Sequence, residues 1–309
     1  MNKKLDTIHT HGLNLVIIFT LAMLILIDKR EFIIPRISAM TVDTNSNSKY
    51  ITLKNNNEES KLNLNIKINV NTKKLDNKIV GISAIIYDPN ENVAIWSQDA
   101  IRVSSLASLT KVMTAYVYKK YCNKEVHFAD LVWSPTEAMQ YMLVESSNEM
   151  ANTLSRVCNI DGEFVDMMNK EAENMNLNLK YKNPSGLDSP GNIGGRGDAM
   201  SIARFFYIAA SKYPDIFDAT THNYSKVEAE NGDNKVSINA INTNKYISNV
   251  GGARMSKTGL TDYAGGNLGI VYDVYLGRPL VMVVLGSTKE GRFRDIDIMR
   301  ESIEIKNKI

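Results

Sequence analysis

The sequence predicts an α+β fold in which strands from two separate parts of the chain form one antiparallel sheet, with a helical lobe inserted between them. Two β-rich runs lie within residues 79–107, and three more lie within residues 250–309. Between them, over about residues 108–249, apolar residues recur mainly at helical spacing. One shared sheet is the economical assembly of this order, because it gives both groups of strands the same core.

Residues 1–30 contain an apolar segment that we assign to targeting or anchoring rather than to the fold. The run "LNLVIIFTLAMLILI" at 13–27 follows Lys3 and Lys4 and has 15 residues, fewer than the roughly 20 of a comfortable membrane span. That length fits a signal peptide, but "DKREFIIPR" follows and the nearest small-residue cleavage candidate, at 38–39, is far downstream. We therefore favour an uncleaved signal-anchor with the rest outside. Cleavage stays an alternative. The flanking charges do not settle the orientation, because Lys3 and Lys4 on one side face Lys29 and Arg30 on the other.

Residues 31–78 have the composition of an Asn-rich linker. The stretches "NSNS" and "NNNEES" are polar and poor in aromatic residues, which is typical of linkers. Over 62–70 apolar and polar residues alternate, which predicts a strand with one apolar face. This strand could cover a sheet edge or form an extended stalk, and the sequence leaves both open. The folded domain is expected to occupy residues 79–309.

The elements of this domain follow in order along the chain. "IVGISAIIYD" and "NVAIWSQD" are β-rich and joined by "PNE", which predicts a hairpin. A helical block runs from Ser108 to about Tyr213; in it "EFVDMMNKEAENM" and "MSIARFFYIAASKY" are amphipathic. After an irregular polar stretch, "ARMSKTG", "GGNLGIVYD" and "RPLVMVVLGS" predict three strands, and "RFRDIDIMRESIEI" predicts a closing helix.

Composition narrows the class of protein. The chain has 309 residues, a formal net charge of +2, 44% apolar residues and 23% charged residues, as ordinary globular proteins do. The near-neutral charge gives no reason to expect a nucleic-acid partner.

Cys122 and Cys158 belong to no Cys/His cluster, which argues against a zinc site. Both lie in apolar helical runs, so we favour buried free thiols over a disulfide, leaving their pairing open. No histidine stands near a candidate nucleophile motif, which disfavours Ser-His-Asp chemistry.

The stretch "ASLTKVMTAY" contains the first candidates for chemistry. Ser108 and Lys111 lie one helical turn apart on one face. Ser108 is at the helix start, where free N–H groups favour developing negative charge. A lysine among apolar side chains should have a lowered pKa, because burial disfavours its charged form. A neutral lysine can then activate a hydroxyl. Alone, the pair is better explained as a serine cap with a lysine that reaches solvent.

Two further motifs combine with this one. Ser146 and Asn148, in "VESSNEMANTL", could relay a proton and hold a substrate peptide, although capping residues at a helix start look the same. Lys257 and Thr258, in "SKTGLTDYAGGN", offer a cation and a hydroxyl to a carboxylate, and Gly259 lets a substrate backbone lie against a strand. Each motif is weak alone, but their order and their positions at a helix start, in the helical lobe and on a strand make the combination specific.

S-x-x-K, S-x-N and K-T-G in this order are the motif set of the penicillin-recognising acyl-transfer enzymes. The stretches "EFVDMMNKEAENMNLNLKYKNPSGLD", "KTGLTDYAGGNL" and "GSTKEGRFRDIDIM" resemble serine-type D-alanyl-D-alanine carboxypeptidases, the low-molecular-weight penicillin-binding proteins, over about residues 80–306. The resemblance implies a β-lactamase/transpeptidase-like fold. It also implies that the protein trims the terminal D-alanine from peptidoglycan stem peptides through an acyl-enzyme, and that penicillin inhibits it.

The resemblance assigns a role to each motif residue. It makes Ser108 the acylated nucleophile, Lys111 its base and Ser146 the proton relay to the departing D-alanine. The residues that it implies in substrate binding are Asn148, Lys257, Thr258 and Gly259. The backbone N–H groups of Ser108 and Leu260 are expected to form the oxyanion hole. No metal or organic cofactor is implied.

The resemblance also implies partners and a location. The partners are stem peptides ending in D-Ala-D-Ala, β-lactams as covalent inhibitors, and the membrane through residues 13–27. We expect the protein on the cell-wall side of the bacterial membrane, anchored by or secreted through that segment. The chain stops after the closing helix, without the C-terminal β-domain and amphipathic anchor of many relatives, which leaves the N-terminal segment as the only expected tether.

Two departures from the family pattern concern the substrate. The second motif usually reads S-G-N-D, whereas residues 146–149 read "SSNE". The span from Lys111 to Ser146 is short, so one wall of the cleft is expected to be reduced. Both departures leave open which stem peptide the protein binds. Neither changes the expected acyl-transfer reaction.

Three other functions stay open. A D,D-endopeptidase uses the same residues, and the shape of the cleft decides between the two. A class A β-lactamase also needs a glutamate in an E-x-x-L-N pattern, but Glu173 is followed by "NMNLN", which misplaces the leucine and the asparagine. A non-catalytic binder of cell-wall peptides would not need every motif residue.

Overall fold

The computed structural model describes residues 39–43, 50–55, 58–63, 66–75, 77–158, 164–275 and 277–307. The chain forms two compact units, one of Met1–Lys67 with Lys306–Ile309 and one of Ile68–Ile305. The apolar segment at 13–27 lies outside the described residues, so the signal-anchor stays a prediction. Among the helices that the structure describes, none has the length and apolarity that crossing a membrane requires.

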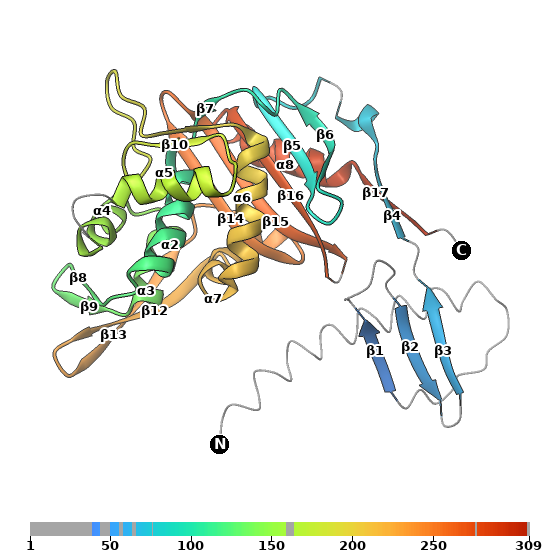
Figure 1. The fold of residues 1–309 in the computed structure, drawn as a ribbon, viewed down its shortest axis with the longest axis horizontal. Coiled ribbons are helices and arrows are strands. Elements are labelled where there is room, and N and C mark those ends of the chain that lie inside the picture. The colour runs from blue at the N-terminus through green and yellow to red at the C-terminus, as the bar shows by residue number, and fades with distance from the viewer. Residues whose placement is uncertain are drawn as a thin grey trace. The chain divides into compact units, whose positions relative to one another are not determined.

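The smaller unit contains a three-stranded antiparallel sheet within the stretch where the sequence predicted a linker (Figure 1). Its strands are β1 (Ala39–Asp43), β2 (Tyr50–Asn55) and β3 (Glu58–Asn63). The predicted strand over 62–70 corresponds to the end of β3 and to β4 (Ile66–Val70), which pairs with β17 (Ile303–Asn307). β1 and β2 were missed because each is short and lies beside one of the polar stretches "NSNS" and "NNNEES", which are typical of linkers.

The larger unit is built around a five-stranded antiparallel sheet with the strand order β14-β15-β16-β5-β6. The strands are β5 (Ser83–Asp88), β6 (Val93–Gln98), β14 (Ala253–Thr261), β15 (Gly265–Tyr275) and β16 (Arg278–Ser287). Strands from both ends of the unit meet where β16 pairs with β5, with Val283 opposite Ile85 (Figure 1). The predicted α+β fold, with a sheet from both chain ends and an inserted helical lobe, is confirmed.

Helices cover both faces of this sheet. One face packs against α6 (Ala199–Lys212), where Val283 joins one apolar cluster, and the other packs against α8 (Gly291–Glu301), where its neighbour Met282 joins a second. A strand that is buried on both faces carries a continuous apolar run, which explains "LVMVVL" in β16. The other helices of the lobe are α2 (Thr110–Tyr121), α3 (Pro135–Val144), α4 (Asn148–Val157), α5 (Phe164–Asn174) and α7 (Pro214–Phe217). The short helical turns are η1 (Thr72–Lys74), η2 (Ala107–Leu109), η3 (Asp218–Thr221) and η4 (Ile247–Asn249).

The lobe also contains strands that the sequence did not reveal. One small sheet has the order β13-β12-β9-β8 and another has the order β10-β11-β7. Their strands are β7 (Ser104–Ser105), β8 (Val126–Phe128), β9 (Leu131–Trp133), β10 (Leu179–Tyr181), β11 (Gly195–Gly197), β12 (Tyr224–Asn231) and β13 (Asn234–Ile241). The hairpin β12–β13 replaces the predicted irregular stretch after Tyr213; it was missed because only small buried residues, such as Val227 and Ala229, mark its inner face. The closing helix is also shorter than predicted, because it ends at Glu301 and β17 follows.

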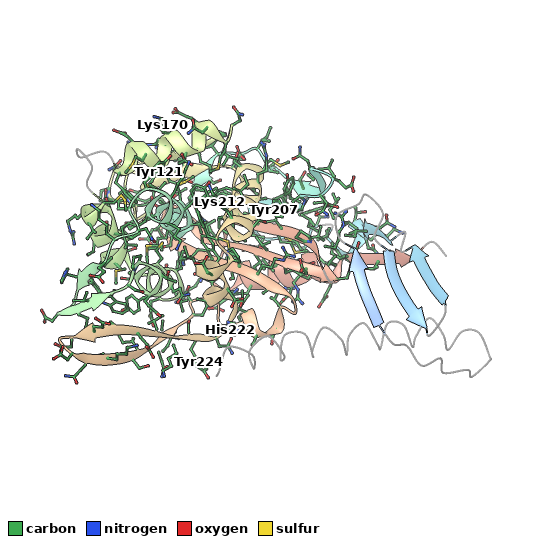
Figure 2. The ribbon with its side chains drawn as sticks, turned by 60° about the horizontal axis from the view of Figure 1, so that its bottom comes forward. Tyr121, Lys170, Tyr207, Lys212, His222 and Tyr224 are labelled. Carbon is green, nitrogen blue, oxygen red and sulfur yellow. A yellow bond between two sulfur atoms is a disulfide. The ribbon has the colours of Figure 1, made fainter. Side chains whose placement is uncertain are left out.

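Cys122 and Cys158 form a disulfide, with their Cα atoms 5.5 Å apart. The prediction of free thiols was therefore wrong. Cys122 ends α2 and Cys158 ends α4, and the ends of these two helices meet in space, which local sequence cannot show. Next to this bridge, Tyr121 donates a hydrogen bond to Glu171 of α5, and Figure 2 shows Tyr121 beside that helix.

Candidate active site

Ser108 and Lys111 lie at the start of α2, with Ser108 on η2 and Lys111 in the first helical turn. Lys111 Nζ donates to Ser108 Oγ (2.8 Å), to Asn148 Oδ1 (2.6 Å) and to the carbonyl oxygen of Ser185 (2.8 Å). Lys111 is completely buried, and this burial lowers its pKa to about 7. The amine is therefore neutral in a large fraction of molecules near pH 7, and in that form it can accept the serine proton.

The loop "NPSGLD" completes the surroundings of Lys111. Its Ser185 supplies the carbonyl acceptor, and Gly186, with φ +72°, follows. A Cβ at Gly186 would lie 1.9 Å from the carbonyl oxygen of Ala107, so only glycine lets the loop approach the nucleophile turn. Ala107 has φ +47°, a conformation that costs on the order of 1–3 kcal/mol and persists only where neighbouring contacts hold it.

Ser146 and Asn148 come from the turn between α3 and α4. Ser146 has φ +58°, and its Oγ accepts a hydrogen bond from Lys257 Nζ (2.9 Å). The residue that caps α4 is Ser147, whose Oγ accepts from the Met150 amide (3.1 Å). Because the middle serine does the capping, the side chains of Ser146 and Asn148 face the two lysines instead.

Lys257 and Thr258 lie on β14, which is an edge strand of the sheet. Lys257 is buried, and its Nζ donates to Ser146 and to the carbonyl oxygen of Thr258 (3.1 Å). Burial, and after it the charges of Lys111 and Arg292, hold the pKa of Lys257 well below its usual range. The three basic side chains at this site, those of Lys111, Lys257 and Arg292, suit an anionic group of a ligand, which would favour their charged forms.

Gly259 lets β14 run close beside the nucleophile turn. A Cβ at this position would lie 2.9 Å from the carbonyl oxygen of Leu106 and 3.3 Å from the backbone nitrogen of Ser108. Leu260, the predicted second donor of the oxyanion hole, is the next residue of the strand, and this residue is 45% exposed. The structure thus brings the three motifs together from a helix, a turn and a strand, and the individual roles of these residues stay predictions.

A family model described as D-alanyl-D-alanine carboxypeptidase matches residues 134–289. The chain belongs to this family. The match spans the S-x-N and K-T-G motifs, whereas Ser108 and Lys111 lie before it and depend on the geometry described above. The resemblance seen in the motifs is therefore confirmed.

Relatives of this carboxypeptidase-family chain differ in their named activities. The D-alanyl-D-alanine endopeptidase of Haemophilus influenzae is 27% identical over 208 residues, which cover 60% of this chain and 68% of the relative. Penicillin-binding protein D2 from Listeria monocytogenes, solved with cefotaxime, shares the fold at 22% identity, with 72% of this chain and 97% of that chain covered and a TM-score of 0.62. The Streptomyces K15 DD-transpeptidase does so at 17% identity, with coverage of 72% and 97% and a TM-score of 0.65. The family and the fold make this protein a serine DD-peptidase.

Two side chains that the sequence did not single out reach the K-T-G strand of the DD-peptidase. Thr243 Oγ1 lies 2.6 Å from Thr258 Oγ1. Arg292, in the first turn of α8, donates from Nη1 to the carbonyl oxygen of Gly259 (2.7 Å), and its buried Nε has no hydrogen-bond partner. Both residues are distant in sequence from K-T-G, and no motif spacing connects them to it.

Two buried asparagines hold Thr243 in position. Asn242 Nδ2 donates to the carbonyl oxygens of Thr220 and His222, at 2.9 Å each. Asn244 Nδ2 donates to Ser256 Oγ (2.7 Å), on β14. The hydrogen bonds of these two asparagines thus hold the Thr243 hydroxyl at the site.

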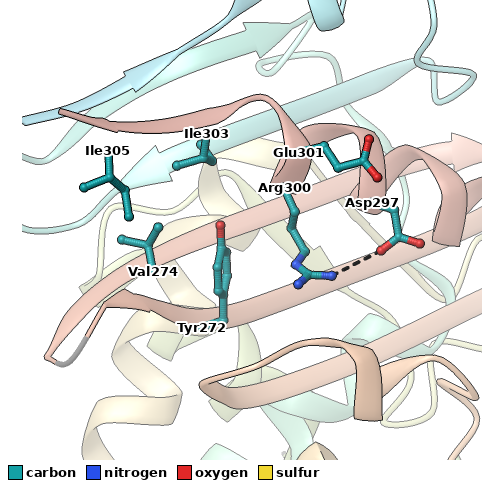
Figure 3. A pocket seen from close by; sticks show the side chains of 7 residues that line it. All are labelled: Tyr272, Val274, Asp297, Arg300, Glu301, Ile303 and Ile305. Carbon is teal, nitrogen blue, oxygen red and sulfur yellow. Dashed lines mark hydrogen bonds and ion pairs between the residues drawn. The ribbon is translucent and has the colours of Figure 1, made fainter. Parts of the chain in front are cut away.

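A separate cavity of about 380 Å³ lies on the α8 face of the sheet (Figure 3). Its lining comes from β15, α8 and β17 and includes the ion pair between Arg300 and Asp297 (3.3 Å). It contains no serine or lysine side chain, so it does not have the groups that acyl transfer needs. Over the described residues, no three His, Cys, Asp or Glu side chains gather in a way that could hold a metal ion.

Proposed function

We propose that this DD-peptidase is a serine D-Ala-D-Ala carboxypeptidase that removes the terminal D-alanine from peptidoglycan stem peptides. The proposal depends above all on two hydrogen bonds from buried lysines to serines: Lys111 to Ser108 (2.8 Å) and Lys257 to Ser146 (2.9 Å). The first pair supplies a nucleophile with a base. The second supplies a hydroxyl, held by a cation, that can pass a proton to a leaving amine.

In the proposed reaction, Ser108 Oγ attacks the carbonyl carbon of the penultimate D-alanine while neutral Lys111 accepts the hydroxyl proton. The backbone N–H groups of Ser108 and Leu260 donate to the oxyanion of the tetrahedral intermediate. When the peptide bond breaks, Ser146 delivers its proton to the departing amine and takes up the proton that Lys111 had accepted, and D-alanine leaves. Water then attacks the ester carbonyl of the acyl-enzyme while neutral Lys111 accepts a proton from it, and Lys111 returns that proton to Ser108 Oγ as the ester bond breaks.

The groups around Thr258 favour a substrate that ends in a free carboxylate. Lys257 and Arg292 supply positive charge there, and Thr243 adds a second hydroxyl beside that of Thr258. On the other side, Asn148 accepts from Lys111 through its oxygen, so its amide N–H₂ can donate to a substrate carbonyl.

The proposal includes partners and a location. β-Lactams are expected to acylate Ser108, and the cefotaxime-bound structure of the Listeria relative supports this expectation. We assign the protein to the cell-wall side of the membrane, where the segment at 13–27 would anchor or export it. The Cys122–Cys158 disulfide supports this assignment, because disulfides persist in oxidising compartments.

Labelling with a fluorescent penicillin tests the nucleophile. Covalent labelling of the wild type and its loss in Ser108→Ala are expected, and persistent labelling of that variant would contradict the assignment. Release of D-alanine from a stem pentapeptide then tests the carboxypeptidase activity. A protein that is labelled but releases no D-alanine would not be a carboxypeptidase.

An endopeptidase that cuts peptide cross-links is the second candidate, because the Haemophilus relative carries that name. The same motif side chains would perform it on a branched substrate: Ser108, Lys111, Ser146, Asn148, Lys257 and Thr258. Cleavage of cross-linked dimers without release of D-alanine from pentapeptide would favour this reaction over the first.

A further inference from the structure

The loop after β10 carries a carboxylate that has no part in the reaction described above. Asp188 Oδ2 accepts hydrogen bonds from Ser105 Oγ (2.9 Å) and from Thr261 Oγ1, and Asp188 Oδ1 accepts from the amide of Gly194 (2.8 Å). These donors lie on β7, at the end of β14 and just before β11. One carboxylate therefore joins three separate segments by charge-assisted hydrogen bonds, which are stronger than neutral ones.

We call the set of hydrogen bonds to Asp188 the Asp188 bridge. Its first arm, the bond from Ser105, lies next to the nucleophile. Ser105 is three residues before Ser108, and the amide of Leu106 donates to the carbonyl oxygen of Gly195 (2.9 Å). Both bonds hold the chain immediately before Ala107, whose left-handed φ depends on neighbouring contacts. The position of the Ser108 amide is therefore set by segments that Asp188 connects.

The second arm ends next to the other predicted oxyanion donor. Thr261 directly follows Leu260, and its Oγ1 also accepts from the amide of Ala264 (3.0 Å) in the turn to β15. On the other side of Leu260, the carbonyl oxygen of Gly259 is held by Arg292. The Leu260 amide is thus fixed from both sides, by the arginine before it and by the aspartate after it.

We infer that Asp188 is a positioning residue that fixes the separation of the two oxyanion-hole amides, those of Ser108 and Leu260. It does so by tying the chain before the first amide to the chain after the second, through its bonds to Ser105, Gly194 and Thr261. The inference rests on the proposed function, because it takes these two amides as the oxyanion hole. Removing one oxyanion donor costs roughly 10²–10³-fold in rate, and a displacement of about 1 Å can cost about 100-fold.

The test separates the rate of acylation from the binding that precedes it. The concentration dependence of labelling by a fluorescent penicillin gives the Kd of the non-covalent complex and the limiting acylation rate constant. In Asp188→Ala we expect the limiting rate constant to fall about 10–100-fold and the Kd to change by less than about threefold. A limiting rate constant equal to that of the wild type would overturn the inference.

A double-mutant cycle tests whether Asp188 acts through Thr261. Thr261→Val removes the hydroxyl at similar volume and should also slow acylation, whereas Thr261→Ser keeps the hydroxyl and should restore most of the rate. The double variant Asp188→Ala/Thr261→Val should be little slower than Asp188→Ala alone, because both changes break one bridge. Additive losses, or a Thr261→Val variant that acylates normally, would overturn it.

Asp198, the residue directly after β11, offers a matched control. It caps α6, accepting from the Ser201 amide (2.7 Å) and from Asn178 Nδ2 (2.8 Å), and touches neither β7 nor β14 by these bonds. Asp198→Ala should lower stability but leave the limiting acylation rate constant of the folded protein unchanged. If Asp188→Ala does not fold, Ser105→Ala and Thr261→Val carry the test. Wild-type limiting rate constants in both would contradict the bridge.

The outcomes also distinguish the bridge from the proposed function. A wild type that is acylated but releases no D-alanine would remove the carboxypeptidase proposal and leave the bridge intact. A wild type that is not acylated at all would overturn both. Normal acylation in wild type and Asp188→Ala alike would overturn the bridge alone.

Discussion

The two buried lysines of the active site have different surroundings, although each donates to a serine hydroxyl. Lys111, at the start of a helix, has three oxygen partners, and burial alone accounts for its pKa of about 7. Lys257, on a strand, also faces the charges of Lys111 and Arg292, and its pKa is held well below the usual range. An arriving carboxylate would favour its charged form again, because an opposite charge raises the pKa of a lysine. The comparison suggests that the helix lysine exchanges a proton and the strand lysine attracts an anion.

The largest expected effect is that of Lys111→Arg, which keeps the charge but cannot give up its proton. Loss of a general base typically costs about 10²–10⁴-fold, so acylation by a fluorescent penicillin should slow by about a thousandfold or more. Lys257→Arg is the matched control and should lose much less. Acylation by the Lys111 variant at a near-normal rate would refute its role as the base.

A smaller effect is expected from Lys257→Met, which removes the cation near Thr258 and the partner of Ser146. Hydrogen bonds to charged groups contribute roughly 1.5–3 kcal/mol, so kcat/KM for D-alanine release should fall about 10–100-fold. The loss should appear mainly in KM, because substrate anion binding is weakened. A variant as inactive as Lys111→Arg would instead mean that both lysines move the same proton.

The pH dependence of acylation tests whether Lys111 must be neutral for the reaction. The pKa of Lys111 is lowered to about 7. The proposed reaction needs the neutral form of this lysine, so the acylation rate constant should rise with pH and level off above about 7. Below that point the neutral fraction, and with it the rate, should fall about tenfold per pH unit. A rate that stays constant between pH 5 and pH 8 would contradict the assignment of Lys111 as the proton acceptor.

The disulfide should affect stability but not the two lysines. Cys122 and Cys158 join the ends of α2 and α4, whereas Lys111 and Asn148 lie at their starts. Replacing both cysteines by alanine should lower the free energy of unfolding by about 3 kcal/mol, measured by denaturant titration. Acylation by the folded variant should change by less than about twofold, and a large loss would show that the bridge also sets the active-site geometry.

The fold class and the three motifs were predictable from sequence because each depends on local patterns. Alternation and apolar runs marked the sheet strands, and the spacing of Ser108 and Lys111 marked one helix turn. The structure confirms the fold and brings the predicted residues of the three motifs together. Their chemical roles stay predictions until the variants above are measured.

What sequence could not show depends on contacts between distant segments. The carbonyl oxygen of Ser185 satisfies Lys111, yet any residue type could supply a carbonyl. Thr243 reaches β14 from the segment after β13, and Arg292 reaches it from α8; no motif records either contact. The cysteines were expected to be free because each looked like part of a buried apolar face. Only the packing of α2 against α4 brings them within bonding distance.

The division of the central sheet between the two ends of the larger unit has a consequence for how the protein matures. Val283 of β16 pairs with Ile85 of β5, about 200 residues earlier in the chain, and pairing over such a separation slows folding. β14, which carries Lys257, Thr258 and Gly259, belongs to the strands that are synthesised last. A nascent chain that already contains Ser108 and Lys111 therefore has a nucleophile and its base but no assembled site. The time after synthesis at which the protein becomes able to react with penicillin would therefore report when its folding is complete.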